Sequence, residues 1–177
     1  MTCQSTRTHN SRLRLRRSCW WSGHLHVRHQ AGLVETTNLT FALAVDDGWP
    51  PVAAEGLPCR PVADGFEVLV PPLFVKGLAV GDVIRVKSEV NGQVTEWETL
   101  RASANSTVWL MVQGVDLRQE LDELRALGCN TSSFPGGQVH SIDVPSSLAI
   151  EELESRLDGK YSEEQVALAY PVWRRED

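Results

Sequence analysis

The chain has 177 residues, of which 42% are hydrophobic and 23% are charged, so we expect a packed core over most of its length. No stretch approaches the roughly 20 consecutive apolar residues that cross a bilayer, which excludes a membrane-spanning helix and predicts a soluble protein. At this length the chain forms one domain or two small ones.

The formal net charge of −6 conceals two segments of opposite sign. Residues 1–30 contain six arginines and no acidic residue, whereas residues 31–177 hold the other 11 basic residues and all 23 acidic ones, which gives −12. Because an acidic body repels phosphate backbones, this distribution argues against nucleic-acid binding by the folded part. A small molecule or a basic protein is the expected partner.

Residues 1–30 are predicted to be a disordered basic extension, such as a start codon placed too early would produce. They lack the apolar run of a secretory signal, but an Arg-rich, acid-free segment also resembles a transit peptide, and its Arg-Leu-Arg-Leu-Arg-Arg run could contact nucleic acid or anionic lipid. His24, His26 and His29 could chelate a transition metal, but no rigid scaffold or fourth ligand is evident, so we expect no metal site.

The four cysteines are too widely spaced for a CxxC metal or redox motif, and too few for a disulfide scaffold. They are Cys3, Cys19, Cys59 and Cys129. This usage is typical of a reducing compartment, so we expect a cytoplasmic protein, and we expect no cofactor.

Residues 36–104 are predicted to form a β-rich half. The apolar and β-branched runs between turn signals predict five strands, at 36–45, 55–61, 66–70, 82–90 and 93–101. Asp-Gly at 64–65 and Asn-Gly at 91–92 are hairpin signals, because these residues adopt positive φ readily. Short strands separated by Gly, Pro and Asn turns indicate a small curved antiparallel sheet or a partial barrel.

Residues 105–173 show the order strand, helix, strand, strand, helix, strand. The strands are expected at 107–113, 129–134, 138–144 and 165–172, with one helix after Asp116 and another after residues 145–147. Asp116 and Gln119 match a capping box, and Gly128 is placed to end the first helix. The order is that of the ferredoxin-like arrangement, so the predicted fold class is α+β with a ferredoxin-like half.

Leucines recur at helical spacing in both helices and predict one buried face on each. They are Leu117, Leu121, Leu124 and Leu127 in the first, and Leu148, Leu153 and Leu157, together with Ile150, in the second. Each fully buried leucine contributes about 1.5–3 kcal/mol in transfer terms. The predicted architecture depends on these residues lying across one face of the sheet.

Four short motifs together resemble the bacterial family called domain of unknown function 4265. They are DGWPP at 47–51, PLFVKG at 72–77, GDV at 81–83 and NST at 105–107. The resemblance covers residues 36–173 and leaves the basic extension outside it. The family pattern has a histidine just before the Ser-Thr pair, where this chain has Asn105, so no catalytic role is expected there. The resemblance implies an architecture and no mechanism.

The candidate ligand-binding or partner-binding residues lie in these motifs. They are Asp47, Trp49, Lys76, Asp82, Ser106 and Thr107. Lys76 and Asp82 flank a glycine-containing turn and could form an ion pair beside a pocket; the alternative is a solvated loop pair. Asp46 and Asp47 could hold a cation, but adjacent aspartates point different ways, so a turn role is favoured.

No motif predicts catalysis strongly enough for a catalytic residue to be assigned. Ser106 and Thr107 with His140 could supply a hydroxyl nucleophile and a base, yet no GxSxG elbow surrounds the serine, and a structural histidine is favoured. Glu96 and Glu98 fall on one side of a strand, about 7 Å apart by strand rise. Glycosidases use carboxylates at such a spacing, but charged residues on a solvent-exposed face produce it by chance.

We therefore expect a non-enzymatic binding or regulatory module for a protein or a small ligand. The alternative is a small hydrolase or transferase with a pocket between the two halves, lined by Trp49, Lys76, Asp82 and Ser106. An enzyme would show a concave pocket where titratable groups converge, whereas a binding module would show a flat, acidic or apolar patch above about 400 Å².

Overall fold

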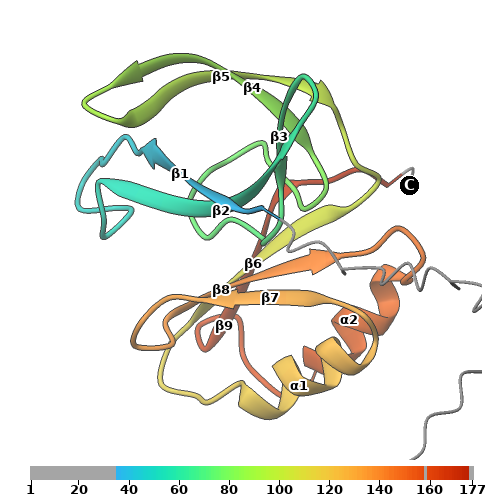
Figure 1. The fold of residues 1–177 in the computed structure, drawn as a ribbon. Helices are drawn as coiled ribbons and strands as arrows, with labels where there is room; N and C mark the ends of the chain where they lie inside the picture. The colour runs from blue at the N-terminus through green and yellow to red at the C-terminus, as the bar shows by residue number, and fades with distance from the viewer. Residues whose placement is uncertain (1–34, 158, 176–177) are drawn as a thin grey trace, which may run out of the picture. The chain divides into compact units, whose positions relative to one another are not determined.

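The computed structural model describes residues 35–157 and 159–175 (Figure 1). The basic extension at 1–30 lies outside the described residues, and its predictions stay predictions. The elements are β1 (Thr37–Ala42), β2 (Ala54–Val62), β3 (Gly65–Val68), β4 (Val83–Val90), β5 (Gln93–Arg101), β6 (Ser106–Val112), α1 (Arg118–Ala126), β7 (Asn130–Ser133), β8 (Val139–Val144), α2 (Ile150–Leu157) and β9 (Val166–Val172). The described part is therefore an α+β fold, as expected.

Strands β1 to β5 form a closed barrel in which each strand pairs antiparallel with the next. Because five is odd, an up-and-down barrel can close only if its first and last strands run the same way. β1 and β5 do so, and pair in parallel at Phe41 and Val94. The sheet is a closed barrel, whereas the sequence predicted a curved sheet or a partial barrel. The difference arises because strand patterns do not reveal whether the first and last strands pair.

The barrel interior holds its own apolar core. It contains Leu39, Phe41, Leu57, Cys59, Val68, Val75, Leu78, Ile84 and Val94. The β4–β5 hairpin turns at Asn91 and Gly92, with φ of 53° and 75°, as the Asn-Gly pair predicts. The burial of alternate residues in β1 and β2 explains why their sequences alternate in polarity.

The second sheet has the strand order β7-β8-β6-β9, with all neighbours antiparallel. Helix α1 connects β6 to β7, and β8 lies between these two strands in the sheet. Helix α2 connects β8 to β9, and β6 lies between them. Both helices lie on one side of this sheet (Figure 1).

The predicted leucine stripes are buried against this sheet. Leu117, Leu121, Leu124, Leu148, Leu153 and Leu157 share one cluster with Val108, Leu110, Val112, Ile142 and Val144 of the central strands. Leu127 and Ile150 are partly buried beside it. The sequence expectation on which the architecture depended is therefore confirmed.

The beginning of α1 differs from the prediction. Leu117 is the N-cap and makes no side-chain capping bond. Asp116 instead accepts a hydrogen bond from the Arg118 backbone N–H at 3.0 Å and pairs with the Arg118 guanidinium, while the Gln119 amide donates to Glu123. The capping box was wrong because an arginine two residues away competes for the same carboxylate. The helix end is as expected, with Gly128 at φ 94°.

The segment between β3 and β4, residues 69–82, lies against the face of the second sheet that turns away from the helices. We call it the 69–82 loop. The Trp109 ring N–H donates to the Pro72 carbonyl at 2.7 Å, and the Thr107 hydroxyl donates to the Leu78 carbonyl at 3.2 Å. Both faces of β6 are therefore covered, which explains its nearly continuous apolar sequence.

The close approach of β3 and β4 gives a direct test of the barrel. A Cβ on Gly65 would lie 2.1 Å from the Ile84 carbonyl oxygen, so Gly65→Ala forces the two strands apart. A Cβ on Gly56 would meet only the side-chain amide of Asn38, which is exposed and can rotate away. We expect Gly65→Ala to lower the free energy of unfolding by about 1–3 kcal/mol and Gly56→Ala to lower it much less. Chemical denaturation of both variants measures this, and equal losses would contradict the barrel geometry.

Candidate functional site

A cleft of about 450 Å³ opens where the end of β1 and the turn after it meet the 69–82 loop, β5 and β6. Its walls are Ala42, Leu43, Ala44, Asp46, Trp49, Pro50, Phe74, Val75, Lys76, Trp97 and Trp109. Ligand sites are typically apolar hollows of this size with a few polar groups. We call it the aromatic cleft.

The turn after β1 holds Trp49 at the mouth of the aromatic cleft. Asp46 and Trp49 exchange both backbone hydrogen bonds, each 2.9 Å long, around Asp47 and Gly48 with φ of 49° and 77°. This is a two-residue hairpin turn with two positive φ angles. Asp47 is therefore exposed at the tip of the turn and does not line the cleft, whereas the Trp49 side chain is 44% exposed.

The aromatic rings of the cleft contact one another through their edges. Trp49 meets Phe74 at 5.6 Å between ring centroids, and Phe74 meets Phe134 of the second sheet's hairpin at 5.3 Å. Trp97 contacts Phe41 of the barrel core at 5.2 Å. Such edge-to-face pairs add about 0.5–1.5 kcal/mol beyond the area they bury. Trp97, which packs against the barrel core, and the buried Trp109 thus also form part of the cleft wall.

Glu55 fixes the wall of the cleft that the 69–82 loop supplies. Its carboxylate accepts hydrogen bonds from three successive backbone N–H groups, at 2.6 Å from Leu73, 2.8 Å from Phe74 and 2.9 Å from Val75. Charge-assisted bonds of this kind are about twice as strong as neutral ones. The sequence offered no signal for this role, because the bonds join β2 to residues 18–20 positions away.

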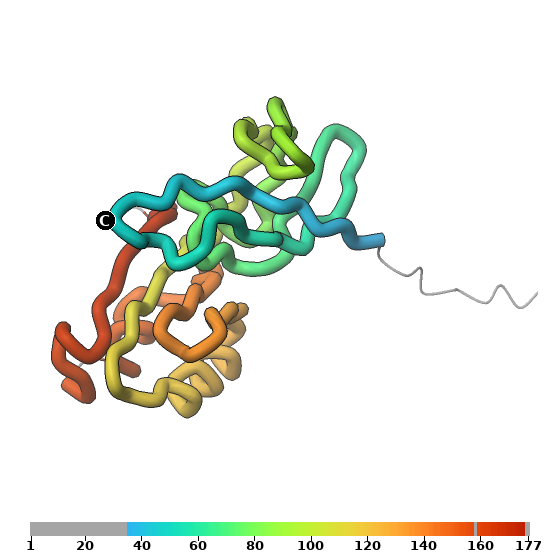
Figure 2. The backbone as a smooth tube through the Cα atoms, turned by 90° about the vertical axis from the view of Figure 1, so that its left-hand side faces the viewer, coloured from blue at the N-terminus to red at the C-terminus, as the bar shows by residue number. Residues whose placement is uncertain are grey.

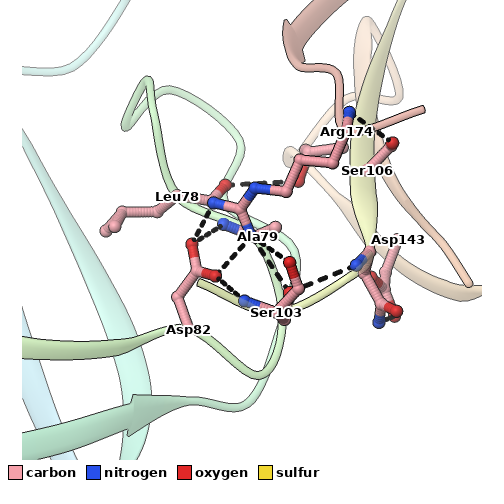
Figure 3. Close-up of polar contacts among 9 residues, drawn as sticks. Leu78, Ala79, Asp82, Ser103, Ser106, Asp143 and Arg174 are labelled. Atoms are coloured by element: carbon pink, nitrogen blue, oxygen red, sulfur yellow. Dashed lines mark hydrogen bonds and ion pairs between the residues drawn. The ribbon is translucent and has the colours of Figure 1, made fainter. Parts of the chain in front are cut away.

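Asp82 belongs to a buried polar cluster that is separate from the aromatic cleft (Figure 3). Its side chain is 0% exposed, and it forms a two-pronged ion pair with Arg174, whose Nη2 lies 2.8 Å from Asp82 Oδ2. The same carboxylate accepts the backbone N–H groups of Ala79 at 2.9 Å and Ser103 at 2.7 Å. Every oxygen of the buried carboxylate is therefore satisfied.

The hydroxyls of the Ser-Thr pair are also structural. Ser106 accepts the Arg174 backbone N–H at 3.1 Å, and Thr107 donates to Leu78 in the 69–82 loop. Both residues are at most 1% exposed. Ser106 thus joins Asp82 and Arg174 in one cluster, which we call the Asp82–Arg174 cluster.

Two expectations about these residues are corrected by the geometry. Lys76 forms no ion pair among the described residues, because the partner of Asp82 is Arg174. The expected pocket residues divide into two groups: Trp49 and Lys76 line the aromatic cleft, whereas Asp82 and Ser106 are buried in the cluster. A pattern within one loop could not reveal an arginine 92 residues further along the chain.

The proposed hydroxyl and imidazole do not meet. On paired strands, Ser106 lies opposite Val144, whereas His140 lies opposite Leu110, four residues further along β6. His140 is 7% exposed and its Nδ1 lies 2.8 Å from the Ser133 hydroxyl; burial lowers the pKa of its imidazole. It is a structural histidine, as favoured.

Of the two glutamates of β5, Glu96 is exposed and Glu98 is held in ion pairs. Glu98 pairs with Lys87 at 2.7 Å and with Arg85 at 3.0 Å. The hydrogen bond from Lys87 is the main cause that lowers the pKa of Glu98. Within residues 35–157 and 159–175, no three His, Cys, Asp or Glu side chains gather to hold a metal ion, and no helix is long and apolar enough to span a membrane.

One buried carboxyl group is only partly satisfied. Asp143 of β8 is 5% exposed, and its Oδ2 accepts the Asn105 amide at 3.2 Å. Its Oδ1 and the hydroxyl of the neighbouring Ser141 have no hydrogen-bond partner among the described residues. Burial raises the pKa of Asp143 to about 6; the hydrogen bond from Asn105 opposes this rise, and the negative charge of Asp82 adds to it.

These features define an α+β protein in which a five-stranded barrel and a helix-covered sheet enclose an aromatic cleft. The chain belongs to the family described as a domain of unknown function (DUF4265), whose model matches residues 55–168. The resemblance inferred from the sequence motifs is thereby confirmed.

A solved structure shares this fold. It is the crystal structure of a hypothetical protein from Neisseria gonorrhoeae, with a TM-score of 0.60 and 18% sequence identity, over 77% of this chain and 95% of that chain. No curated protein matches the chain.

The Asp82–Arg174 pair makes a prediction about stability. Arg174→Met leaves a carboxylate buried without its countercharge, so we expect a loss of about 3–5 kcal/mol in the free energy of unfolding. Arg85→Met makes the same substitution in the exposed pair with Glu98 and is expected to cost less than about 1 kcal/mol. Urea denaturation distinguishes the two, and a small loss for Arg174→Met would show that the cluster does not hold the segments together.

Asp143 makes a prediction about pH dependence. Its carboxyl holds a proton more tightly in the folded protein, at a pKa of about 6, than at the ordinary value of 3.8. The stability that this proton contributes is therefore complete below the unfolded pKa and is lost as the pH rises through the folded pKa. Relative to the native protein, Asp143→Asn should gain stability between about pH 4 and about pH 7 and stay level above.

The free energy of unfolding is measured by denaturation at each pH for the native protein and for Asp143→Asn. The difference between the two proteins isolates Asp143, because His140 is present in both and its contribution cancels. A difference that is constant across this pH range would mean that the carboxyl titrates normally.

Proposed function

We propose that this chain is a non-enzymatic binding module that holds a small ligand with a planar apolar portion in the aromatic cleft. The observation that carries the proposal is the cleft itself, a hollow of about 450 Å³ with three tryptophans and a phenylalanine in its walls. Flat rings bind well against aromatic faces and edges, because these give large contact area at little cost in side-chain freedom.

The charged groups of the cleft indicate the polar end of the ligand. Lys76 and Asp46 line the cleft and are both exposed, so they lie on its solvent side. Since Lys76 forms no ion pair among the described residues, its ammonium is available to an anionic group. We therefore propose a ligand whose ring enters the cleft while a carboxylate, sulfonate or phosphate faces Lys76.

The cleft is suited to binding without rearrangement. Glu55 holds the backbone from Leu73 to Val75 through three hydrogen bonds, and two backbone bonds hold the turn that presents Trp49. A wall that is fixed before the ligand arrives loses less conformational freedom on binding. This preorganisation supports a binding role.

The chemistry of the walls favours binding over the hydrolase or transferase alternative. Among the described residues that line the cleft, none carries a hydroxyl, thiol or imidazole group. The titratable groups in the walls are Lys76 and Asp46, and neither side chain is hydrogen-bonded to a second catalytic group among the described residues. The buried hydroxyls of Ser106 and Thr107 are engaged elsewhere.

We further propose that the second sheet and its helices form a ferredoxin-like unit. The order β-α-β-β-α-β, the separation of each helix-joined strand pair by one other strand, and the placement of both helices on one face support it. In this arrangement the face without helices is free for another layer, and here the 69–82 loop contacts it through Pro72 and Leu78.

Two fluorescent probes that differ in one charged group test the ligand class. Anilinonaphthalene sulfonate is planar and anionic, and N-phenylnaphthylamine is its uncharged counterpart. We expect Trp49→Ala to weaken the binding of both probes about fivefold, which corresponds to one aromatic contact of ~1 kcal/mol. Lys76→Glu should weaken only the sulfonate probe, because only that probe carries a charge.

Trp173→Ala is the matched control, since it removes an indole that does not line the aromatic cleft. It should change both dissociation constants by less than about twofold. Fluorescence titration gives these constants, and melting curves confirm that the variants fold. Equal effects of Trp49→Ala and Trp173→Ala, or no binding of either probe, would refute the proposal.

A further inference from the structure

A second hollow lies between α2 and β9, away from the aromatic cleft. It measures about 390 Å³ and is lined by Glu154, Leu157, Tyr161, Glu163, Val166, Leu168 and Tyr170. We call it the β9 groove. Its floor is apolar, its two carboxylates are on exposed residues, and the Tyr170 side chain is 41% exposed.

The β9 groove runs beside an open edge of the second sheet. β9 pairs only with β6 among the described strands, and Figure 2 shows this C-terminal strand, in red, along the outer side of the sheet. An edge strand presents unpaired N–H and C=O groups that can pair with an added strand. The opposite edge strand, β7, has four residues and donates from Asn130 to the Leu69 carbonyl, so it is less open.

The residues around the groove are strongly acidic. Residues 150–165 contain six acidic and two basic side chains. The two basic ones are already paired, Arg156 with Glu123 at 4.0 Å and Lys160 with Glu120 at 3.4 Å. No ion pair engages Glu154 or Glu163 among the described residues, and the hydroxyl of Tyr170 donates to Glu154 at 3.2 Å and holds that carboxylate beside the strand.

We propose that β9 and its groove bind an extended basic peptide, which adds to the sheet as a further strand. Successive side chains of a strand point to opposite faces, so alternate residues of the peptide face the groove. Among these groove-facing residues, apolar ones contact Leu157 and Leu168, and lysines or arginines contact Glu154 and Glu163. Such a peptide gains main-chain hydrogen bonds, apolar contact and charge neutralisation together.

The charge of the groove also argues against a second copy of this chain as the occupant. Pairing β9 with the β9 of another molecule would bring two sets of glutamates together, and like charges juxtaposed at an interface are costly. Pro171 limits the length of the added strand, because it has no backbone N–H to donate. At the other end, the Val166 N–H already donates to the Ser162 carbonyl, so pairing is expected along residues 167–170.

The test uses the full chain and a fluorescein-labelled peptide of sequence Arg-Thr-Leu-Thr-Arg-Thr-Leu-Thr-Arg-Gly, in which arginine and leucine alternate along one face and threonine occupies the other. Fluorescence anisotropy measures its affinity. One control peptide has glutamate in place of each arginine. Another keeps the sequence but carries N-methyl groups on alternate residues, on the edge that would pair with β9, which prevents strand pairing without changing the charge. We expect the acidic peptide not to bind, and the N-methylated one to bind at least tenfold more weakly.

Protein variants locate the site. Glu154→Lys combined with Glu163→Lys should weaken the basic peptide at least tenfold. Glu151→Lys combined with Glu152→Lys is the matched control, because it also reverses two charges, at exposed residues of α2 that do not line the groove, and it should weaken binding less than twofold. Neither variant touches the aromatic cleft, so binding of the two naphthalene probes should not change in either, which separates this test from that of the proposed function.

Four results would overturn the inference. Equal binding of the N-methylated peptide would mean diffuse charge attraction without strand addition. Equal loss in the control variant and in Glu154→Lys with Glu163→Lys would place binding elsewhere. Failure of the basic peptide to bind would show that the groove takes no such strand. A dimer in sedimentation equilibrium that is lost on charge reversal of the groove would assign β9 to a second copy of the chain.

Discussion

The buried pair of Asp82 and Arg174 is the interaction on which the arrangement of the described fold depends. It joins the end of the 69–82 loop to the segment after β9, and Ser103, between β5 and β6, donates to the same carboxylate. Three parts of the chain that are distant in sequence are thus fixed at one carboxylate (Figure 3). A buried pair contributes little net stability compared with apolar packing, but losing one partner is costly. The pair therefore specifies how the barrel and the second sheet meet.

The consequences reach the aromatic cleft through the 69–82 loop. One end of this loop is held by Asp82 and its middle by Glu55, so the residues between them, Phe74 and Lys76, are placed by two carboxylates outside the cleft. Asp82 accepts backbone N–H groups from its own loop and from the chain before β6, which carries Trp109. Two carboxylates outside the cleft thus satisfy the backbone N–H groups behind this wall.

Local and periodic features of the chain were predictable from the sequence. The leucines of α1 and α2 and the Asn91-Gly92 turn follow from spacing and backbone preference, and the structure confirms them. Contacts between distant residues were not predictable, because no pattern links Asp82 to Arg174 or Glu55 to the 69–82 loop. Closure of the barrel, where Phe41 pairs with Val94, was likewise not predictable, because it also joins residues that are distant in the sequence. In the candidate site, the sequence motifs pointed to Trp49 and Lys76, and both line the aromatic cleft. The motifs also pointed to Ser106, which is buried, because a polar residue in a motif gives no sign of whether its side chain will be buried or exposed.

The strand pair β6 and β9 links the two proposed surfaces. Trp109 of β6 lines the aromatic cleft and lies opposite Ala169 of β9, while the neighbouring Leu168 lines the β9 groove. Because successive residues of a strand face opposite sides, one register between these strands places both surfaces. A shift by one residue would turn Leu168 away from the groove. The register is fixed by the apolar cluster beneath the helices and, at the end of β9, by Arg174 in its buried pair, so the ion pair that sets the cleft also sets the edge that a peptide would meet.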